Sequence, residues 1–133
     1  MAKKTVFLLC SILFFQFISA QSQFVKVKGD HFYINNTPYF YIGTNYWYGG
    51  LLPLKKDEKK GIDRLREELD FLKKNGVINL RVLAGSEGKG IINGVTRVGP
   101  PIQPEEGVFD PNFLKGMDVF LNELDKRKMT AVI

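Results

Sequence analysis

The order of apolar patterns in the second half of the chain most constrains its fold. An amphipathic helix over 61–74 is followed by an apolar strand from Val77 to about Ala84. A second helix, from Asp110, is followed by an apolar strand over 130–133. Strands that alternate with helices in this way form a parallel sheet with helices packed against it. The sequence therefore predicts an α/β fold.

Both helices are predicted from the spacing of apolar residues and from signals at their ends. Apolar side chains recur on one helical face in each segment: Ile62, Leu65, Leu69 and Leu72 in the first, and Phe113, Met117, Phe120, Leu121 and Leu124 in the second. Asn75-Gly76 is typical of a helix C-terminus, and Asp110-Pro111 of an N-cap followed by the first helical residue. The charged segment 55–60, which precedes the first helix, is predicted to be solvated.

The segment before residue 45 has the short alternating runs of β-structure. Phe24–Val27 and His31–Ile34 are separated by residues that favour a turn, which predicts a hairpin. Asn35–Pro38 is predicted as a second turn, because Pro cannot continue a ladder. A further strand is predicted over Tyr39–Thr44. We interpret His31 as an edge-strand residue rather than an acid or a base.

Arg81 is the charged residue that interrupts the apolar strand beginning at Val77. A charge buried in such a strand requires carboxylate or ligand oxygens as partners. Because the carboxyl ends of strands carry the chemistry of repeating β/α folds, Arg81 is a candidate functional residue. A purely structural ion pair explains the pattern equally well.

An aromatic cluster, Tyr46-Trp47-Tyr48, follows the strand that precedes the first helix. A flat aromatic face suits the C–H face of a sugar ring. Packing beneath neighbouring loops is the alternative. The position of the cluster beyond a strand end favours sugar binding by at least one of the three residues, with Trp47 and Tyr48 as candidates.

The connection over 85–110 is long for a loop between a strand and a helix. Asn93-Gly94 predicts a hairpin within it. The Gly-Lys pair at 88–89 lacks the Ser or Thr and the helix that a phosphate-binding loop requires, so we reject a nucleotide site. Glu87 has no evident second carboxylate within 21–133, and we interpret it as a loop residue rather than a catalyst.

Residues 1–20 have the pattern of a secretory signal peptide. Lys3 and Lys4 precede an apolar segment, Val6–Ile18, and Ser19-Ala20 precede the expected cleavage point. The apolar segment is short for a membrane span, so an uncleaved anchor is the less favoured alternative. We therefore predict a secreted protein with no membrane association after cleavage.

Composition excludes several kinds of site. The single cysteine, Cys10, lies within the signal, and His31 is the single histidine. Residues 21–133 thus contain no disulfide, no thiolate nucleophile and no His or Cys metal cluster, and we predict no metal or cofactor. Loss of Lys3 and Lys4 lowers the formal charge from +5 to +3. The charges are scattered without the basic stripe of a nucleic-acid-binding protein.

Three segments together resemble secreted endo-β-1,4-mannanases of glycoside hydrolase family 5. They are Gly43–Tyr48, the helix Asp63–Gly76 and Asn79–Val82, and the segments Phe109–Leu114 and Leu121–Ile133 fit the same pattern. The resemblance implies a (β/α)8 TIM barrel with an N-terminal hairpin. It also implies retaining cleavage of mannan, galactomannan or glucomannan, with no cofactor.

The resemblance also implies roles for individual residues. Arg81 matches an arginine that hydrogen-bonds the catalytic nucleophile, and an aromatic residue at Trp47 or Tyr48 lines a substrate subsite. The two catalytic glutamates of the family follow later strands, the fourth and the seventh. Residues 21–133 are therefore expected to be the N-terminal portion of the catalytic domain, a truncated barrel of a hairpin plus strand–helix–strand–helix–strand.

By itself this portion is expected to be inactive and poorly soluble, because half a barrel exposes strand edges and apolar helix faces. Two alternatives remain open at this point. One is another family 5 activity, such as β-1,4-glucanase. The other is a non-catalytic carbohydrate-binding protein.

Overall fold

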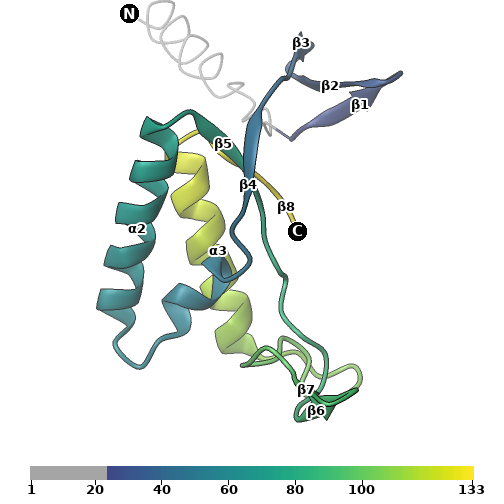
Figure 1. Cartoon of the computed structure of the whole chain (residues 1–133), viewed down its shortest axis with the longest axis vertical. Helices are drawn as coiled ribbons and strands as arrows, with labels where there is room; N and C mark the ends of the chain where they lie inside the picture. Colours follow the sequence, from purple (N-terminus) through teal and green to yellow (C-terminus); the bar gives the residue numbers. More distant parts are fainter. Residues whose placement is uncertain (1–23) are drawn as a thin grey trace, which may run out of the picture. The chain divides into compact units, whose positions relative to one another are not determined.

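The computed structural model describes residues 24–133 (Figure 1). The predicted signal peptide, residues 1–20, lies outside this range. The described residues divide into two units, one that ends at Tyr39 and one that spans Phe40–Ile133. Within residues 24–133, no helix is both long enough and apolar enough to cross a membrane.

The first unit contains an antiparallel sheet of three short strands, in the order β1-β2-β3. They are β1 (Lys26–Lys28), β2 (His31–Ile34) and β3 (Thr37–Pro38). Gly29, at φ +64°, lies in the turn between β1 and β2, a conformation that glycine adopts at no steric cost. The predicted hairpin is confirmed.

The expectation that Asn35–Pro38 forms only a turn was wrong. Thr37 and Pro38 pair with Ile34 and Tyr33, so the reversal is confined to Asn35 and Asn36, both at positive φ. Proline is tolerated here because β3 is an edge strand, where no neighbour needs its missing N–H. It also follows that β2 is the central strand, so His31 is not an edge-strand residue; its Nδ1 contacts Asp30 Oδ1.

The second unit is built on a parallel sheet in the order β4-β5-β8. Its strands are β4 (Ile42–Asn45), β5 (Val77–Arg81) and β8 (Thr130–Val132). The predicted order of strands and helices is confirmed, although β4 and β5 are shorter than expected. The described strands form an open sheet and not a closed barrel.

Two α-helices, α2 (Glu58–Lys74) and α3 (Pro111–Lys126), connect the strands. Asp57 caps α2 by accepting from Lys60 N, and Asp110 caps α3 by accepting from Asn112 N and Phe113 N. The helix α2 begins three residues before the predicted Gly61, because the cap at Asp57 draws part of the charged 55–60 segment into its first turn. A short 3-10 helix, η2 (Gly49–Leu54), joins β4 to α2.

The core lies between the sheet and the helices, which lie side by side in Figure 1. Its largest fully buried side chains are Phe113, Phe120, Leu65, Leu69 and Leu80. Leu80 points toward the helices, so its neighbours Asn79 and Arg81 point to the opposite face of β5. Asn79 Nδ2 donates to Thr130 Oγ1 at 2.7 Å. Asn79, Arg81 and Thr130 therefore place polar side chains on the face away from the helices.

The long connection between β5 and α3 contains the predicted hairpin. It is formed by β6 (Ile91–Ile92) and β7 (Val95–Thr96), with Asn93 and Gly94 at positive φ. Two positive φ values in succession match the turn that suits a two-residue hairpin. The base of the loop is held by Ile102 N donating to Ser86 O at 3.0 Å. The connection is thus a long loop with its own hairpin and backbone hydrogen bonds, and it begins at the carboxyl end of β5.

Candidate functional site

The carboxyl ends of the parallel strands place three residues in one row. Asn45 at the end of β4 pairs in register with Arg81 at the end of β5, and Arg81 pairs with Val132 of β8. Residues paired across a parallel sheet project from the same face. The chain therefore brings an amide and a guanidinium together at the edge of the sheet where β/α folds carry their chemistry.

Arg81 is exposed, so the interpretation of it as a buried charge was wrong for residues 24–133. The apolar residues on either side, Leu80 and Val82, are buried. They are the reason that the sequence predicted a buried strand. Arg81 projects from the uncovered face instead. Its Nη1 donates to Asn45 Oδ1 over 3.4 Å, a long hydrogen bond that leaves most of its donors available.

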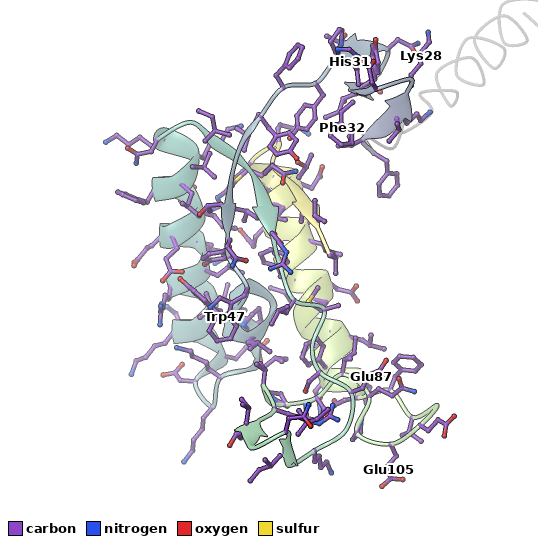
Figure 2. The ribbon with its side chains drawn as sticks, turned by 45° about the vertical axis from the view of Figure 1, so that its right-hand side comes forward. Lys28, His31, Phe32, Trp47, Glu87 and Glu105 are labelled. Atoms are coloured by element: carbon purple, nitrogen blue, oxygen red, sulfur yellow. The ribbon has the colours of Figure 1, made fainter. Side chains whose placement is uncertain are left out.

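Trp47 follows β4 directly and stays beside β5. Its carbonyl oxygen accepts from Leu83 N at 3.3 Å, two residues beyond Arg81. Trp47 is 43% exposed, and its ring makes a T-shaped contact with the Tyr48 ring, with centroids 5.5 Å apart and planes at 81°. Figure 2 shows Trp47 in this segment. Trp47 therefore presents an aromatic surface to solvent near the carboxyl ends of the strands.

The two tyrosines on either side of Trp47 point toward α2. Both phenol groups donate to Oε2 of Glu68, Tyr48 at 3.1 Å. Arg64 Nε donates to Oε1 of the same carboxylate at 2.6 Å. Tyr46 is only 4% exposed and belongs to the core, whereas Tyr48 is half-buried. The structure thus distinguishes the exposed Trp47 from the two tyrosines, whereas the sequence gave both Trp47 and Tyr48 as candidates.

Glu68 is the residue at this position that sequence reasoning missed. It falls within the predicted helix over 61–74, where the i, i+4 spacing from Arg64 gave the only hint of a partner. Its bonds to two tyrosines depend on the strand end lying against α2, which no local pattern specifies. We call Arg64, Glu68, Tyr46 and Tyr48 the tyrosine–carboxylate cluster.

The cluster keeps its protonation state over a wide pH range. Burial, and then the hydrogen bond to Glu68, raise the pKa of both Tyr46 and Tyr48 above the ordinary value. Burial opposes ionisation of Glu68, but hydrogen bonds from Tyr46, Arg64 and Tyr48 outweigh it and lower the pKa of the carboxyl. At neutral pH the phenols therefore donate to a carboxylate.

Beside this cluster, a cavity of about 480 Å³ lies between β4 and α2. It is lined by Thr44, Asn45, Tyr46, Tyr48, Glu67, Glu68, Phe71 and Leu72. Phe71 is 67% exposed at its margin. The cavity adjoins β4, which is an outer strand of the described sheet.

Glu87 lies in the long loop, apart from the strand ends. Its side chain is exposed, and its carbonyl oxygen accepts from the Arg97 guanidinium. A second cavity, of about 380 Å³, is lined by Glu87, Gly88, Arg97, Gln103, Glu105 and Glu106. Figure 2 shows Glu87 and Glu105 in this loop region. Between residues 24 and 133, no group of three or more His, Asp or Glu side chains has the arrangement of a metal site.

Comparison with known proteins identifies relatives over most of the chain. Residues 22–133 match the sequence model of a protein family described as glycoside hydrolase family 5, β-mannosidase-like. Among curated proteins, none matches the chain.

Solved structures of one fungal enzyme are similar to the chain. The glycoside hydrolase family 5 mannosidase from Rhizomucor miehei has a TM-score of 0.66 and 30% sequence identity, over 83% of this chain and 26% of that one. A glutamate-to-alanine variant of it has a TM-score of 0.65 and 31% identity, over 83% and 27%. Another such variant, in complex with mannosyl-fructose, has a TM-score of 0.64 and 31% identity, over 83% and 26%. The chain thus spans about a quarter of the length of these structures.

Proposed function

Because the chain belongs to glycoside hydrolase family 5, we propose that it forms the N-terminal part of a secreted enzyme that cleaves internal β-1,4-mannosidic bonds in mannans. In this proposal the parallel sheet of three strands is the first part of a (β/α)8 barrel. The remaining strands and both catalytic carboxylates lie outside residues 24–133. No metal or cofactor is required for such a reaction.

The observation that carries the proposal is the arrangement at the carboxyl ends of β4 and β5. Arg81 lies in register with Asn45, and the exposed Trp47 follows β4 beside Leu83. A guanidinium suits a carboxylate or a sugar hydroxyl, and an indole face suits the C–H face of a sugar. The arrangement is thus suited to one end of a saccharide cleft.

Arg81 would act on the nucleophile rather than on the bond that breaks. In retaining hydrolysis one carboxylate attacks the anomeric carbon, while a second carboxyl protonates the leaving oxygen and later activates water. A guanidinium that donates to the attacking carboxylate keeps it ionised and fixes its orientation. The exposed donors of Arg81 are available for that interaction.

Trp47 would form the floor of a sugar subsite. Replacing it by Ala in the full-length protein is expected to raise the KM for mannan oligosaccharides about 10-fold, because a stacked ring contributes on the order of 1 kcal/mol or more. Tyr48→Ala tests the second predicted aromatic in the same assay. Unchanged KM values for both variants would remove the aromatic cluster from the substrate site.

The direct test is product analysis with the full-length protein. Reduced β-1,4-manno-oligosaccharides, galactomannan and cello-oligosaccharides are incubated separately, and the released sugars are separated and identified. Internal cleavage of the mannan substrates supports the proposal. Cleavage of the cellulosic substrate instead would assign a β-1,4-glucanase, and binding without cleavage would assign a non-catalytic protein.

Residues 21–133, expressed alone, serve as the matched control in this assay. They are expected to release no reducing sugar, because the two carboxylates that the reaction needs lie outside them in this proposal. Detectable hydrolysis by the purified piece would contradict the division of the barrel proposed here. Secretion is tested separately, by sequencing the N-terminus of protein recovered from the medium, with Gln21 expected first.

A second candidate is removal of terminal mannose from short oligosaccharides. It is favoured by the family description, β-mannosidase-like, and by the relative solved in complex with the disaccharide mannosyl-fructose. The same product analysis separates the two activities. Mannose as the sole early product indicates terminal cleavage, whereas a ladder of shorter oligosaccharides indicates internal cleavage.

A further inference from the structure

We propose that Glu68 and Tyr48 are positioning residues that hold the indole of Trp47 in the orientation needed to receive a sugar ring. This inference rests on the proposed function, since it requires that Trp47 bind substrate. Neither residue is proposed to contact the sugar. Their effect is transmitted through the T-shaped contact between the Tyr48 ring and the indole.

The contact between Trp47 and Tyr48 is the last step of a chain that begins on α2. Glu68 accepts from the Tyr48 phenol at 3.1 Å and from Arg64 Nε at 2.6 Å. The Arg64 guanidinium also lies 5.6 Å from the centre of the Tyr48 ring. The ring of Tyr48 is thus held at its hydroxyl by one residue of the helix and over its face by another.

A second tyrosine supports the Tyr48 ring from the core side. The centroids of Tyr46 and Tyr48 are 4.7 Å apart, and the Tyr46 ring stacks on Phe120 of α3. Gly49 packs so closely on Tyr46 that a Cβ there would lie 2.6 Å from its ring. This close packing confines Tyr46, so its ring is suited to support the Tyr48 ring.

Such support has a function when the supported side chain is itself exposed. Trp47 is 43% exposed, and an exposed aromatic side chain samples several rotamers unless its neighbours select one. A binding surface already in its bound orientation avoids the ordering cost that a mobile one incurs on binding. The tyrosine–carboxylate cluster is therefore expected to lower the KM for substrate with little effect on the chemical step.

The test compares Glu68→Gln and Tyr48→Phe with the control Glu67→Gln in the full-length protein. Tyr48→Phe keeps the ring and removes only its bond to Glu68. Glu67 is the exposed neighbour of Glu68 on α2, so the control makes the same chemical change one position away. Each variant is assayed for KM and kcat on the substrate identified above, and a thermal melt establishes that it is folded.

We expect KM to rise about 5-fold for both Glu68→Gln and Tyr48→Phe, with kcat within about twofold of the parent and no change for the control. In a Trp47→Ala background, Glu68→Gln should have no further effect on KM, because the residue that it positions is gone. An equal effect of Glu68→Gln with and without Trp47 would overturn the inference.

A spectroscopic measurement tests the same inference without catalysis. Tryptophan is replaced biosynthetically by fluorotryptophan, and the variant Trp47→Phe identifies the fluorine resonance of residue 47. Tyr48→Phe should shift or broaden that resonance, whereas Glu67→Gln should leave it unchanged. An unchanged resonance in both Tyr48→Phe and Glu68→Gln would refute the positioning role.

The outcomes for the two proposals are distinguishable. If Trp47→Ala leaves KM unchanged, the assignment of Trp47 to the substrate site is wrong and the positioning inference is refuted with it. If Trp47→Ala raises KM while Glu68→Gln and Tyr48→Phe do not, the substrate site stands and only the positioning inference is refuted.

Discussion

Replacing Glu123 with glutamine removes the central anion of an ion network between α2 and α3. The Glu123 side chain is 3% exposed and receives Arg66 Nη2 at 3.1 Å, Lys126 Nζ at 2.7 Å and Arg127 Nη1 at 2.8 Å. Arg127 in turn pairs with Asp70 on α2 at 2.7 Å. A neutral amide at this place keeps the volume but leaves three cations without their shared partner.

The magnitude follows from the pKa of the carboxyl. Burial opposes ionisation of Glu123, but hydrogen bonds from Lys126, Arg127 and Arg66 outweigh it and lower the pKa from 4.5 to about 2. Each pKa unit corresponds to about 1.4 kcal/mol, so ionised Glu123 contributes about 3 kcal/mol to stability. Glu123→Gln should lower the free energy of unfolding by about that amount at neutral pH.

The pH dependence gives the sharper test. Because folding lowers this pKa, the contribution is fully present well above 4.5 and is lost as the pH falls toward 2. The difference between the parent protein and Glu123→Gln should therefore be about 3 kcal/mol above pH 6 and about 1.5 kcal/mol at pH 3. Urea titrations followed by circular dichroism, at a series of pH values, measure it.

Asp125→Asn is the matched control. Asp125 is 77% exposed and lies 4.0 Å from Lys128, so its loss should change stability by less than about 0.5 kcal/mol at any pH. A stability difference for Glu123→Gln that does not vary with pH would refute the linkage argument. A difference as small as that of the control would show that the network adds nothing measurable.

Two further predictions concern the ends of the helices. Gly61→Ala should destabilise the protein by about 2 kcal/mol, because the new Cβ would lie 2.0 Å from the carbonyl oxygen of Leu52. This effect opposes the usual one, since Ala normally stabilises a helix relative to Gly. Thermal melts measure the effect, with Lys60→Ala as the control at an exposed position. A Gly61→Ala protein as stable as the parent would contradict the packing of η2 on α2. Asp110→Ala should lower the free energy of unfolding by about 1 kcal/mol, because the Asp110 carboxylate accepts from Asn112 N and Phe113 N. Urea titrations measure this effect, and Asp118→Ala, at an exposed position of the same helix, should lower the free energy of unfolding by less.

The elements predicted from sequence were those with local causes. The cap and the apolar face of the helix from Asp110 are specified by residues within the helix segment itself. The turn type of the hairpin is specified by two residues, Asn93 and Gly94. The strand at Thr37-Pro38, which pairs with Ile34 and Tyr33, was missed because a proline is tolerated in a strand only at a sheet edge, and no local pattern shows which strand lies at the edge.

In the candidate site too, the residues with a local sequence signal were predicted and those that depend on distant contacts were not. Arg81 and Trp47 could be proposed as candidates because Arg81 interrupts an apolar run and Trp47 follows one. The burial expected for Arg81 was wrong, since the sequence shows a charge between apolar residues but not which sheet faces are covered. Glu68 was missed because its partners, Tyr46 and Tyr48, meet it only when β4 lies against α2.

The open sheet has a consequence for biosynthesis. At the outer edges of β4 and β8, no other described strand pairs with the backbone N–H and C=O groups. Ile42 in β4 is 65% exposed, and Phe71 on α2 is 67% exposed. Domains generally fold as units, so part of a domain that has left the ribosome exposes unpaired strand edges and apolar surface, which favour aggregation. If the sheet belongs to the barrel proposed above, a nascent polypeptide that has reached Ile133 is expected to bind chaperones until further strands of that barrel cover these edges.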